Sequence, residues 1–557
     1  MTKRHQWAQR GLKAALFAGC ACAVISSAAA QLAEPTAPLR LRSDYFGWGA
    51  SVSPRVSYTD NINLAPDGLE DDSFIFSNLF TGAAIMSRPR FTGIISGDLD
   101  LSYIQDGSDF AVNQNIGGAS TTTVAENLLY VDISGSTSRQ LLGENARFSS
   151  NLNAARRQRA NVHSYSASPY FYRQFADSSS AEVRYRFSQV FVDDRNAGAN
   201  PFAGGLLNDS TTQEAIAAYD TGTRLGRLNL NLSAYGNKTV ENGSAFAPDF
   251  EYEQASLTSA VRFALTENFA LSGAVGYDEV QTEAVPGLYD DDALSGVFWR
   301  AGFTATPGRK THIRLEYGER YNDDFIDASL SYAISSRFRF TAGAGRSFET
   351  RAQSISGQFR TLQRDTLDFA DRLREGAELS ADNIVDAANR VSRGGLNSQS
   401  VGIGVSNRAF ARLTGAYERF EVSAGASYQN TDFGYRQNEN YSLNVDVRRQ
   451  ISRRLTAYGN VFYRHTGTTI DQGTCQATPF IFGFDVTDPL FDPVEACLEY
   501  ALRNGRSDTA GGRVGASYRL YENVSAFGEF SHTNRFADAD ILEYGENNVV
   551  LGVTIDF

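Results

Sequence analysis

Four histidines follow the leading segment of the chain, and none stands in a pattern that catalysis requires. They are His163, His312, His465 and His532, scattered one to a predicted strand or strand end. No Ser or Asp stands near them at the spacing of a nucleophile and its base. G-x-S-x-G, H-E-x-x-H and Cys/His metal clusters are also absent from the sequence. We therefore predict no enzymatic activity, no cofactor and no metal site. An active site assembled in space would need a His and an acid to converge, with His465 and His532 as the candidates.

Arginine carries nearly all of the positive charge, because the only lysines are Lys3, Lys13, Lys238 and Lys310. Several arginines share one parity of their predicted strands with Tyr and Glu residues. The set predicted to line a polar interior is Arg184, Arg186, Arg262, Arg300, Arg314, Glu182, Glu316, Tyr235 and Tyr252. The planar guanidinium groups of Arg and the flat rings of Tyr can bind a hydroxyl-rich or carboxylate-bearing polymer. The alternative is that a wet interior needs polar walls, braced by Arg–Glu ladders, whatever its cargo.

The N-terminus has the pattern of a secretory signal peptide. Lys3, Arg4, Arg10 and Lys13 precede an apolar run, and an A-x-A site ends at Ala30. Cleavage there removes four positive charges and no acids, which changes the net charge from −13 to −13 − 4 = −17. An acidic exported chain is not expected to bind nucleic acid.

Two cysteines, Cys475 and Cys497, remain after cleavage. A lone pair in an oxidising compartment favours a disulfide, which would stabilise the loop by roughly 3 kcal/mol in the chain-entropy model. Free thiols or a metal pair are the alternatives, and no His lies near either cysteine in sequence to support the metal.

The C-terminal stretch alternates strictly between apolar and mostly small or polar residues. The apolar set, predicted to face a membrane, is Val549, Leu551, Val553, Ile555 and Phe557. A terminal strand must pair its free edge, most economically with the first strand, so this pattern favours a closed barrel. The composition agrees with that fold: 12% aromatic residues, 49 Gly, only 13 Pro and a mean hydropathy of −0.32.

Similar alternating stretches follow one another along the chain, separated by connections of alternating length. Tight turns near 87–89, 266–268, 307–310 and 522–523 alternate with longer polar loops such as 60–72, 194–209 and 535–546. Short periplasmic turns and long external loops are typical of outer-membrane barrels. We predict an all-β fold, a large antiparallel transmembrane β-barrel of about twenty strands, give or take two. The count is uncertain by one at 136–161, where a weak strand and a long irregular crossing are both compatible with the sequence.

One segment has helical rather than strand spacing. Phe359, Leu362, Phe369 and Leu373 recur at helical intervals, and a second helix is expected from Ser380 to the glycines that follow Arg393. The predicted organisation is a signal peptide at 1–30, a periplasmic tail at 31–47 and the barrel at 48–557. The barrel carries a helical loop insert at 353–397 and a disulfide-closed extracellular loop at 466–506. The insert is expected to fold into the lumen or to pack outside it.

Several motifs resemble the putative β-barrel porin family, in its branch of outer-membrane proteins associated with PEP-CTERM and exopolysaccharide gene clusters. The resemblance lies in Y-T-D-N at 58–61, S-P-Y at 168–170 and R-Y-R at 184–186, together with the closing strand. It implies a bacterial outer-membrane barrel that serves export of a surface polysaccharide, and it supplies no site residues. The helical insert is a departure from the family pattern.

From the sequence we predict a passive, porin-like channel for exopolysaccharide export. The alternative is a structural or adhesive barrel with a plugged lumen and binding loops. Its expected partners are outer-membrane lipid, the barrel-assembly machinery, polysaccharide and periplasmic export components. A TonB-dependent transporter is not expected, because no separate plug domain precedes the first predicted strand.

Overall fold

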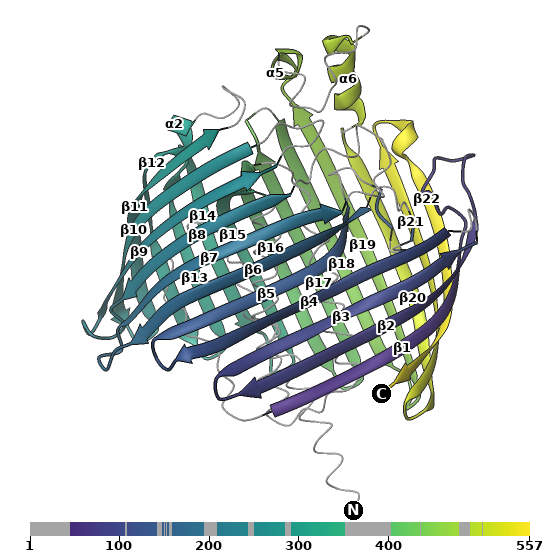
Figure 1. Ribbon diagram of the computed structural model, residues 1–557, viewed down its shortest axis with the longest axis horizontal. Helices are drawn as coiled ribbons and strands as arrows, with labels where there is room; N and C mark the ends of the chain where they lie inside the picture. Colours follow the sequence, from purple (N-terminus) through teal and green to yellow (C-terminus); the bar gives the residue numbers. More distant parts are fainter. Residues whose placement is uncertain are drawn as a thin grey trace, which may run out of the picture.

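The chain folds into one closed antiparallel barrel, shown in Figure 1. The computed structural model describes residues 45–105, 109–141, 147–149, 151, 153–154, 159–193, 209–242, 250–283, 291–350, 403–434, 436–477, 491–503 and 505–557. Its strands are β1 (Tyr45–Thr59), β2 (Ser73–Arg88), β3 (Phe91–Ile104), β4 (Asp109–Ala125), β5 (Leu129–Leu141), β6 (Arg159–Gln174), β7 (Ser180–Asp193), β8 (Ser210–Asp220), β9 (Leu228–Glu241), β10 (Phe250–Thr266), β11 (Phe269–Glu283), β12 (Gly296–Gly308), β13 (Thr311–Arg320), β14 (Asp323–Ala333), β15 (Phe338–Thr350), β16 (Ile403–Tyr417), β17 (Phe420–Asp432), β18 (Arg436–Gln450), β19 (Leu455–Ile470), β20 (Ser507–Tyr521), β21 (Val524–Ala537) and β22 (Tyr544–Asp556). The short helices are α2 (Asp291–Leu294), α5 (Gln472–Ala477), α6 (Pro493–Arg503) and the 3-10 turn η4 (Asp540–Leu542).

The predicted fold class is confirmed: the sheet holds 22 strands, each paired with its neighbours in sequence. This number lies at the upper end of the expected range. Pairing of β1 with β22 closes the barrel, from Ser51↔Asp556 to Thr59↔Asn548. That ladder skips Ser53 and Pro54, as expected where proline has no N–H to donate. The described residues between β5 and β6, which are 147–149, 151 and 153–154, are not in a strand.

The barrel has one end rich in loops and one end of tight turns. We call the end with α2, α5 and α6 the loop end, and the end where β1 begins and β22 ends the turn end (Figure 1). Two-residue connections at the turn end include 89–90, 267–268, 309–310 and 522–523. The predicted alternation of long and short connections is therefore present. Assignment of the loop end to the cell exterior stays a prediction.

Side chains alternate between the two faces of every strand, as the pleat requires. In β1 the inner set is polar, with Ser51, Ser53 and Ser57 buried, whereas Trp48 on the other parity is 58% exposed. On β22 the apolar set from Val549 to Phe557 lies on the outer face. The outer surface is thus an apolar belt around a polar interior.

Several predicted boundaries shift or lie outside the described residues. Strand β1 begins at Tyr45, three positions before the expected start of the barrel at 48, and β19 runs to Ile470, beyond the expected loop start at 466. The signal peptide at 1–30 and most of the tail at 31–47 lie outside the described residues, as does the helical insert at 353–397. The helices α2, α5 and α6 were not predicted from the sequence.

The β13–β14 hairpin has the shortest strands, so the barrel wall is lower at its turn than elsewhere at the loop end. Its two-residue turn consists of Tyr321 and Asn322, with φ angles of 57° and 54°. Positive φ at both positions matches the right-handed twist of paired strands. The ladder between β14 and β15 stops at Ala328↔Ala344, although β14 extends to Asp323, so beyond Ala344 β15 no longer pairs with β14.

Candidate functional site: the inner wall and loop end

All nine residues predicted to line the interior lie on the inner register of their strands. Glu182, Arg184 and Arg186 are on β7, Tyr235 is on β9, Tyr252 and Arg262 are on β10, Arg300 is on β12, and Arg314 and Glu316 are on β13. Seven of them take part in two clusters on the wall, Tyr252 packs against Phe348 at the loop end, and Arg262 is solvent exposed. Whether any of them contacts a transported molecule remains a proposal.

The first cluster lies on β5–β9 and centres on Arg184. Its guanidinium lies 2.8 Å from the carboxylate of Asp132 and 2.6 Å from that of Glu182. It also stacks 3.7 Å above the ring centroid of Tyr170. Further along the wall, Arg186 pairs with Glu214 at 3.0 Å, and the Tyr235 hydroxyl donates to the same carboxylate at 3.1 Å. Each cation here has a carboxylate partner, so this part of the wall is braced.

The second cluster is a four-membered ionic ring on β12–β14. Arg300 pairs with Glu316 at 3.3 Å and with Asp327 at 3.1 Å. Arg314 pairs with the same two acids at 2.8 Å and 3.2 Å. Each carboxylate is therefore shared between two guanidinium groups from neighbouring strands. We call these four residues the β12–β14 ring.

Three acidic partners of these arginines were not predicted from the sequence. Asp132, Glu214 and Asp327 lie on the inner parity of β5, β8 and β14. Strand parity could have found Glu214 and Asp327, which pair with Arg186 and Arg314 on adjacent strands, because like-facing residues of adjacent strands are neighbours. It could not have found Asp132 or Asp278, which pair with Arg184 and Arg320 across an intervening strand.

The connection between β5 and β6 enters the barrel and bonds to its closing strands. The Glu546 carboxylate on β22 accepts hydrogen bonds from Ser149, from Asn151 at 3.4 Å and from Thr59 at 3.0 Å. All four side chains are buried. Of the two alternatives for 136–161, the described residues support the irregular crossing.

The same connection touches strands on either side of the β1–β22 closure. Phe148 makes an edge contact with Phe462 of β19, at 5.4 Å between centroids. Its backbone N–H donates to the Tyr544 hydroxyl at 2.8 Å. On the other side, Asn153 donates to Ser102 of β3 at 3.1 Å. We call the described residues of 147–154 the inner strap, because they span from β3 to β19 inside the barrel.

A second contact bridges the wall at the loop end, between β10 and β15. Phe348 packs edge-on against Tyr252, with centroids 5.9 Å apart, and lies 5.7 Å from the Tyr321 ring. Val280 and Leu294 complete this buried apolar cluster. Burial raises the pKa of Tyr321 to about 12, and its hydroxyl oxygen accepts a hydrogen bond from Gln254 at 3.3 Å. The interior is thereby narrowed above the short β13–β14 hairpin.

Exposure of the inner face differs between the two ends on β12–β20. Near the loop end the inner residues Glu316 and Asn438 are buried, whereas Arg314 and Arg448, closer to the turn end, are accessible. On β1–β7 the inner residues are buried or half-buried along most of the wall. The described residues therefore outline an interior that is more open toward the turn end.

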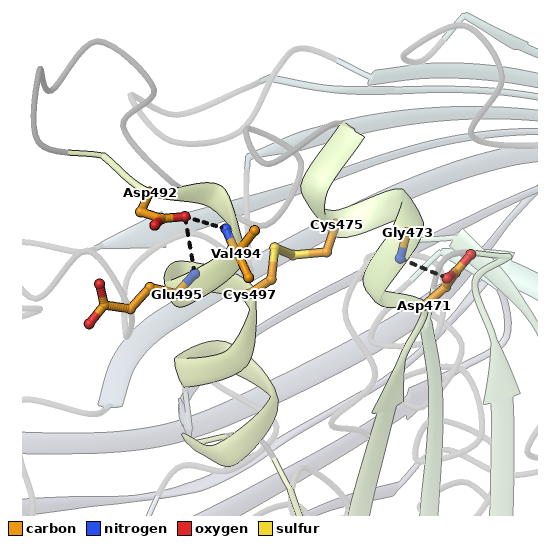
Figure 2. The surroundings of a disulfide bond; sticks show 7 residues. All are labelled: Asp471, Gly473, Cys475, Asp492, Val494, Glu495 and Cys497. Carbon is orange, nitrogen blue, oxygen red and sulfur yellow. Dashed lines mark hydrogen bonds between the residues drawn. A yellow bond between two sulfur atoms is a disulfide. The ribbon is translucent and has the colours of Figure 1, made fainter.

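The predicted disulfide is present and links α5 to α6 at the loop end (Figure 2). The Cα atoms of Cys475 and Cys497 are 6.0 Å apart, and both side chains are buried. Asp471 caps α5 by accepting from the Gly473 N–H at 3.0 Å, and Asp492 caps α6 by accepting from the Val494 N–H at 2.8 Å. A hydrogen bond from Thr474 is the main reason why the pKa of Asp471 is lowered.

The rim histidines do meet polar partners. His465 Nδ1 lies 2.8 Å from Asp508 Oδ1, and His532 Nδ1 lies 2.8 Å from Asn547 Oδ1. No hydroxyl or thiol is hydrogen-bonded to either ring among the described residues, so a nucleophile for the His–Asp pair is not in place there. The same residues hold no group of three His, Cys, Asp or Glu side chains suited to a metal ion. None of the described helices is long and apolar enough to cross a bilayer.

No protein-family model matches the sequence, and no curated protein matches it. Solved structures with a similar fold include the siderophore receptor PiuA from Acinetobacter baumannii, with 10% identity and a TM-score of 0.46 over 93% of this chain and 82% of that one. The ferric-catecholate import receptor Fiu from E. coli K12 has 9% identity and a TM-score of 0.45 over 93% and 82%. A mutant of the ferric enterobactin receptor PfeA from Pseudomonas aeruginosa has 10% identity and a TM-score of 0.43 over 92% and 80%. Similarity at this level carries no argument about the site or its ligand.

The architecture itself defines the class. A closed barrel of 22 antiparallel strands with an apolar outer belt and a polar inner wall is a transmembrane β-barrel of the bacterial outer membrane. More narrowly, it is a large barrel whose interior holds structured polypeptide, in the form of the inner strap.

Proposed function

We propose that this protein is an outer-membrane channel for polar, hydroxyl- or carboxylate-bearing solutes, and that export of an exopolysaccharide is its particular role. The observation that carries the proposal is the polar inner face, on which arginines, acids and tyrosines follow the barrel wall. Such a wall replaces the water that a polar polymer would lose in lipid. We further propose that the loop end faces outward, so that solute enters from the more open turn end.

The channel would be closed at rest rather than permanently wide. The inner strap and the Phe348–Tyr252 contact both occupy the interior. In the β12–β14 ring and the Arg184 cluster, each guanidinium group pairs with a carboxylate of the same cluster. These ion pairs brace the wall, and the guanidinium groups face the interior without a large net charge.

Single-channel conductance of the refolded protein in planar bilayers tests this function. The matched variant lacks 353–397, the predicted helical insert. We expect low, intermittent conductance from the intact chain, and transient current blocks when an acidic oligosaccharide is added on the turn side. Neutral dextran of similar length is the control for size alone.

The second candidate is a structural or adhesive barrel with a permanently filled lumen. The bonds that hold the inner strap to Glu546 favour it, because they tie polypeptide firmly inside the barrel. Absence of current from both the intact chain and the deletion variant would reject the channel and support this candidate. Large steady currents from the deletion variant alone would instead indicate a gated channel.

A further inference from the structure

A polar pocket lies on the outer wall at the loop end, apart from the interior. It has a volume of about 370 Å³, within the range of small-ligand sites of ~300–1,000 Å³. Strands β17–β19 contribute Asn430, Gln437, Glu439 and His465 on their outer parity. The segment that follows α6 contributes Arg506, and Asp538 follows β21. We call this the rim pocket.

The rim pocket stands directly above an aromatic row on the outer surface. Along β19 the outward side chains change from Val461, which is 64% exposed, through Tyr463 to His465. Along β18 the same order runs from Leu443 through Tyr441 to Glu439. A belt of Tyr between aliphatic and polar residues marks the membrane–water interface in barrels. The pocket is therefore at the level of the lipid headgroups.

The polar groups of the pocket are held in fixed orientations. His465 is oriented through Nδ1 by Asp508, which also accepts from the Tyr463 hydroxyl at 2.6 Å. The Tyr441 hydroxyl donates to Glu439, and its ring lies 5.5 Å from that of His465. Orientation of His465 through Nδ1 leaves Nε2 on the side of Gly467, whose absent Cβ would lie 3.5 Å from it.

The chemistry of these groups fits a sugar better than a bare phosphate. Amides and carboxylates recognise hydroxyl groups by donating and accepting in alternation, and the lining holds the amides Asn430 and Gln437 beside its carboxylates. Two carboxylates, Glu439 and Asp538, stand against one guanidinium, Arg506, so the lining does not favour a multiply charged anion.

We propose that the rim pocket binds the sugar headgroup of a glycolipid in the membrane leaflet at the loop end. The acyl chains would lie on the apolar surface around Val461 and Leu443, directly below the sugar. A lipid is favoured over a free sugar because Glu439 and His465 of the pocket lie on the same outer faces of β18 and β19 as the exposed Leu443 and Val461.

Gly467 offers a variant that blocks the pocket without removing any of its polar side chains. A Cβ at this position would meet only His465 Nε2 at 3.5 Å and Arg506 Cγ at 3.9 Å, so the backbone accepts a side chain. Gly467→Leu should fill the pocket. The matched control is Gly236→Leu on the outer face of β9, where a Cβ would meet nothing within 4 Å.

The experiment uses the refolded full chain in phosphatidylcholine nanodiscs that contain digalactosyl diacylglycerol or phosphatidylglycerol. After release into mild detergent, native mass spectrometry measures the fraction of protein that retains one test lipid. We expect the wild type and Gly236→Leu to retain the glycolipid in preference to phosphatidylglycerol. Retention by Gly467→Leu should fall about tenfold, as expected for loss of one or two hydrogen bonds.

Equal retention of both lipids, or unchanged retention by Gly467→Leu, would overturn the proposal. Displacement of the glycolipid by an equal concentration of free digalactose would also overturn it, since the lipid chains would then contribute nothing. If Gly467→Leu does not fold, the double substitution Asn430→Ala with Gln437→Ala provides the same test, because it removes two amides that line the pocket from neighbouring strands.

Discussion

Removal of one acid from the β12–β14 ring should destabilise the barrel measurably. Asp327→Asn keeps the size of the side chain but removes the charge that Arg300 and Arg314 share, at 3.1 Å and 3.2 Å. Arg300 is only 6% exposed, so its guanidinium cannot turn to bulk water when the acid is lost.

The size of the expected loss of stability follows from how deeply Arg300 and Arg314 are buried. Loss of one partner from a fully buried ion pair costs about 3–5 kcal/mol. Glu316 still lies 3.3 Å from Arg300, which reduces that cost. Arg314 is 32% exposed, so its share is that of a surface pair, roughly 0.2–1 kcal/mol. We expect the free energy of unfolding to fall by about 2–3 kcal/mol.

Urea titration of the barrel refolded in lipid vesicles measures this change, with the heat-modifiable gel shift as the readout of folding. The control is Asp324→Asn on the outer, exposed face of the same strand, where we expect less than about 0.5 kcal/mol. A double-mutant cycle with Arg300→Gln isolates the coupling. Equal, small effects of the two Asp→Asn changes, or an absence of coupling to Arg300, would refute the reasoning.

Three further outcomes follow from the same structure. Leu551→Arg on the outer face of β22 should lower the free energy of unfolding by about 2–4 kcal/mol if it lies near the bilayer midplane. Val550→Arg on the inner face should be tolerated. Equal folding yields of the two variants in vesicles would contradict the assigned register. The double variant Cys475→Ser with Cys497→Ser should remove roughly 3 kcal/mol of loop stabilisation and make the α5–α6 loop sensitive to limited trypsin digestion. The barrel itself should stay folded, so loss of the heat-modifiable gel shift would contradict this prediction. Phe148→Ala removes the edge contact with Phe462, which is worth about 0.5–1.5 kcal/mol, and should increase the open-channel time in bilayers. The control is Phe338→Ala on the outer face at the turn end, which should leave the open-channel time unchanged.

The sequence determined the fold class because strand alternation is a local property. From Val549 to Phe557, and in the similar stretches that precede it, period two separates an apolar from a more polar face, and short turns alternate with long loops. The same parity placed Arg184, Arg300 and Glu316 on one face. Parity could not fix the number of strands, because 136–161 is compatible with either one more strand or an irregular crossing.

Only the tertiary structure decided which residues meet across the barrel. Glu546 and Ser149 are far apart in sequence, as are Tyr252 and Phe348, and no local pattern pairs them. These contacts depend on the closure of β1 on β22, on the length of the β13–β14 hairpin and on the path of the inner strap. The rim pocket likewise exists only because β19 extends to Ile470, beyond Thr466↔Ser507, where its pairing with β20 ends. Period two fixes the face on which a side chain lies, whereas register and closure fix its partner.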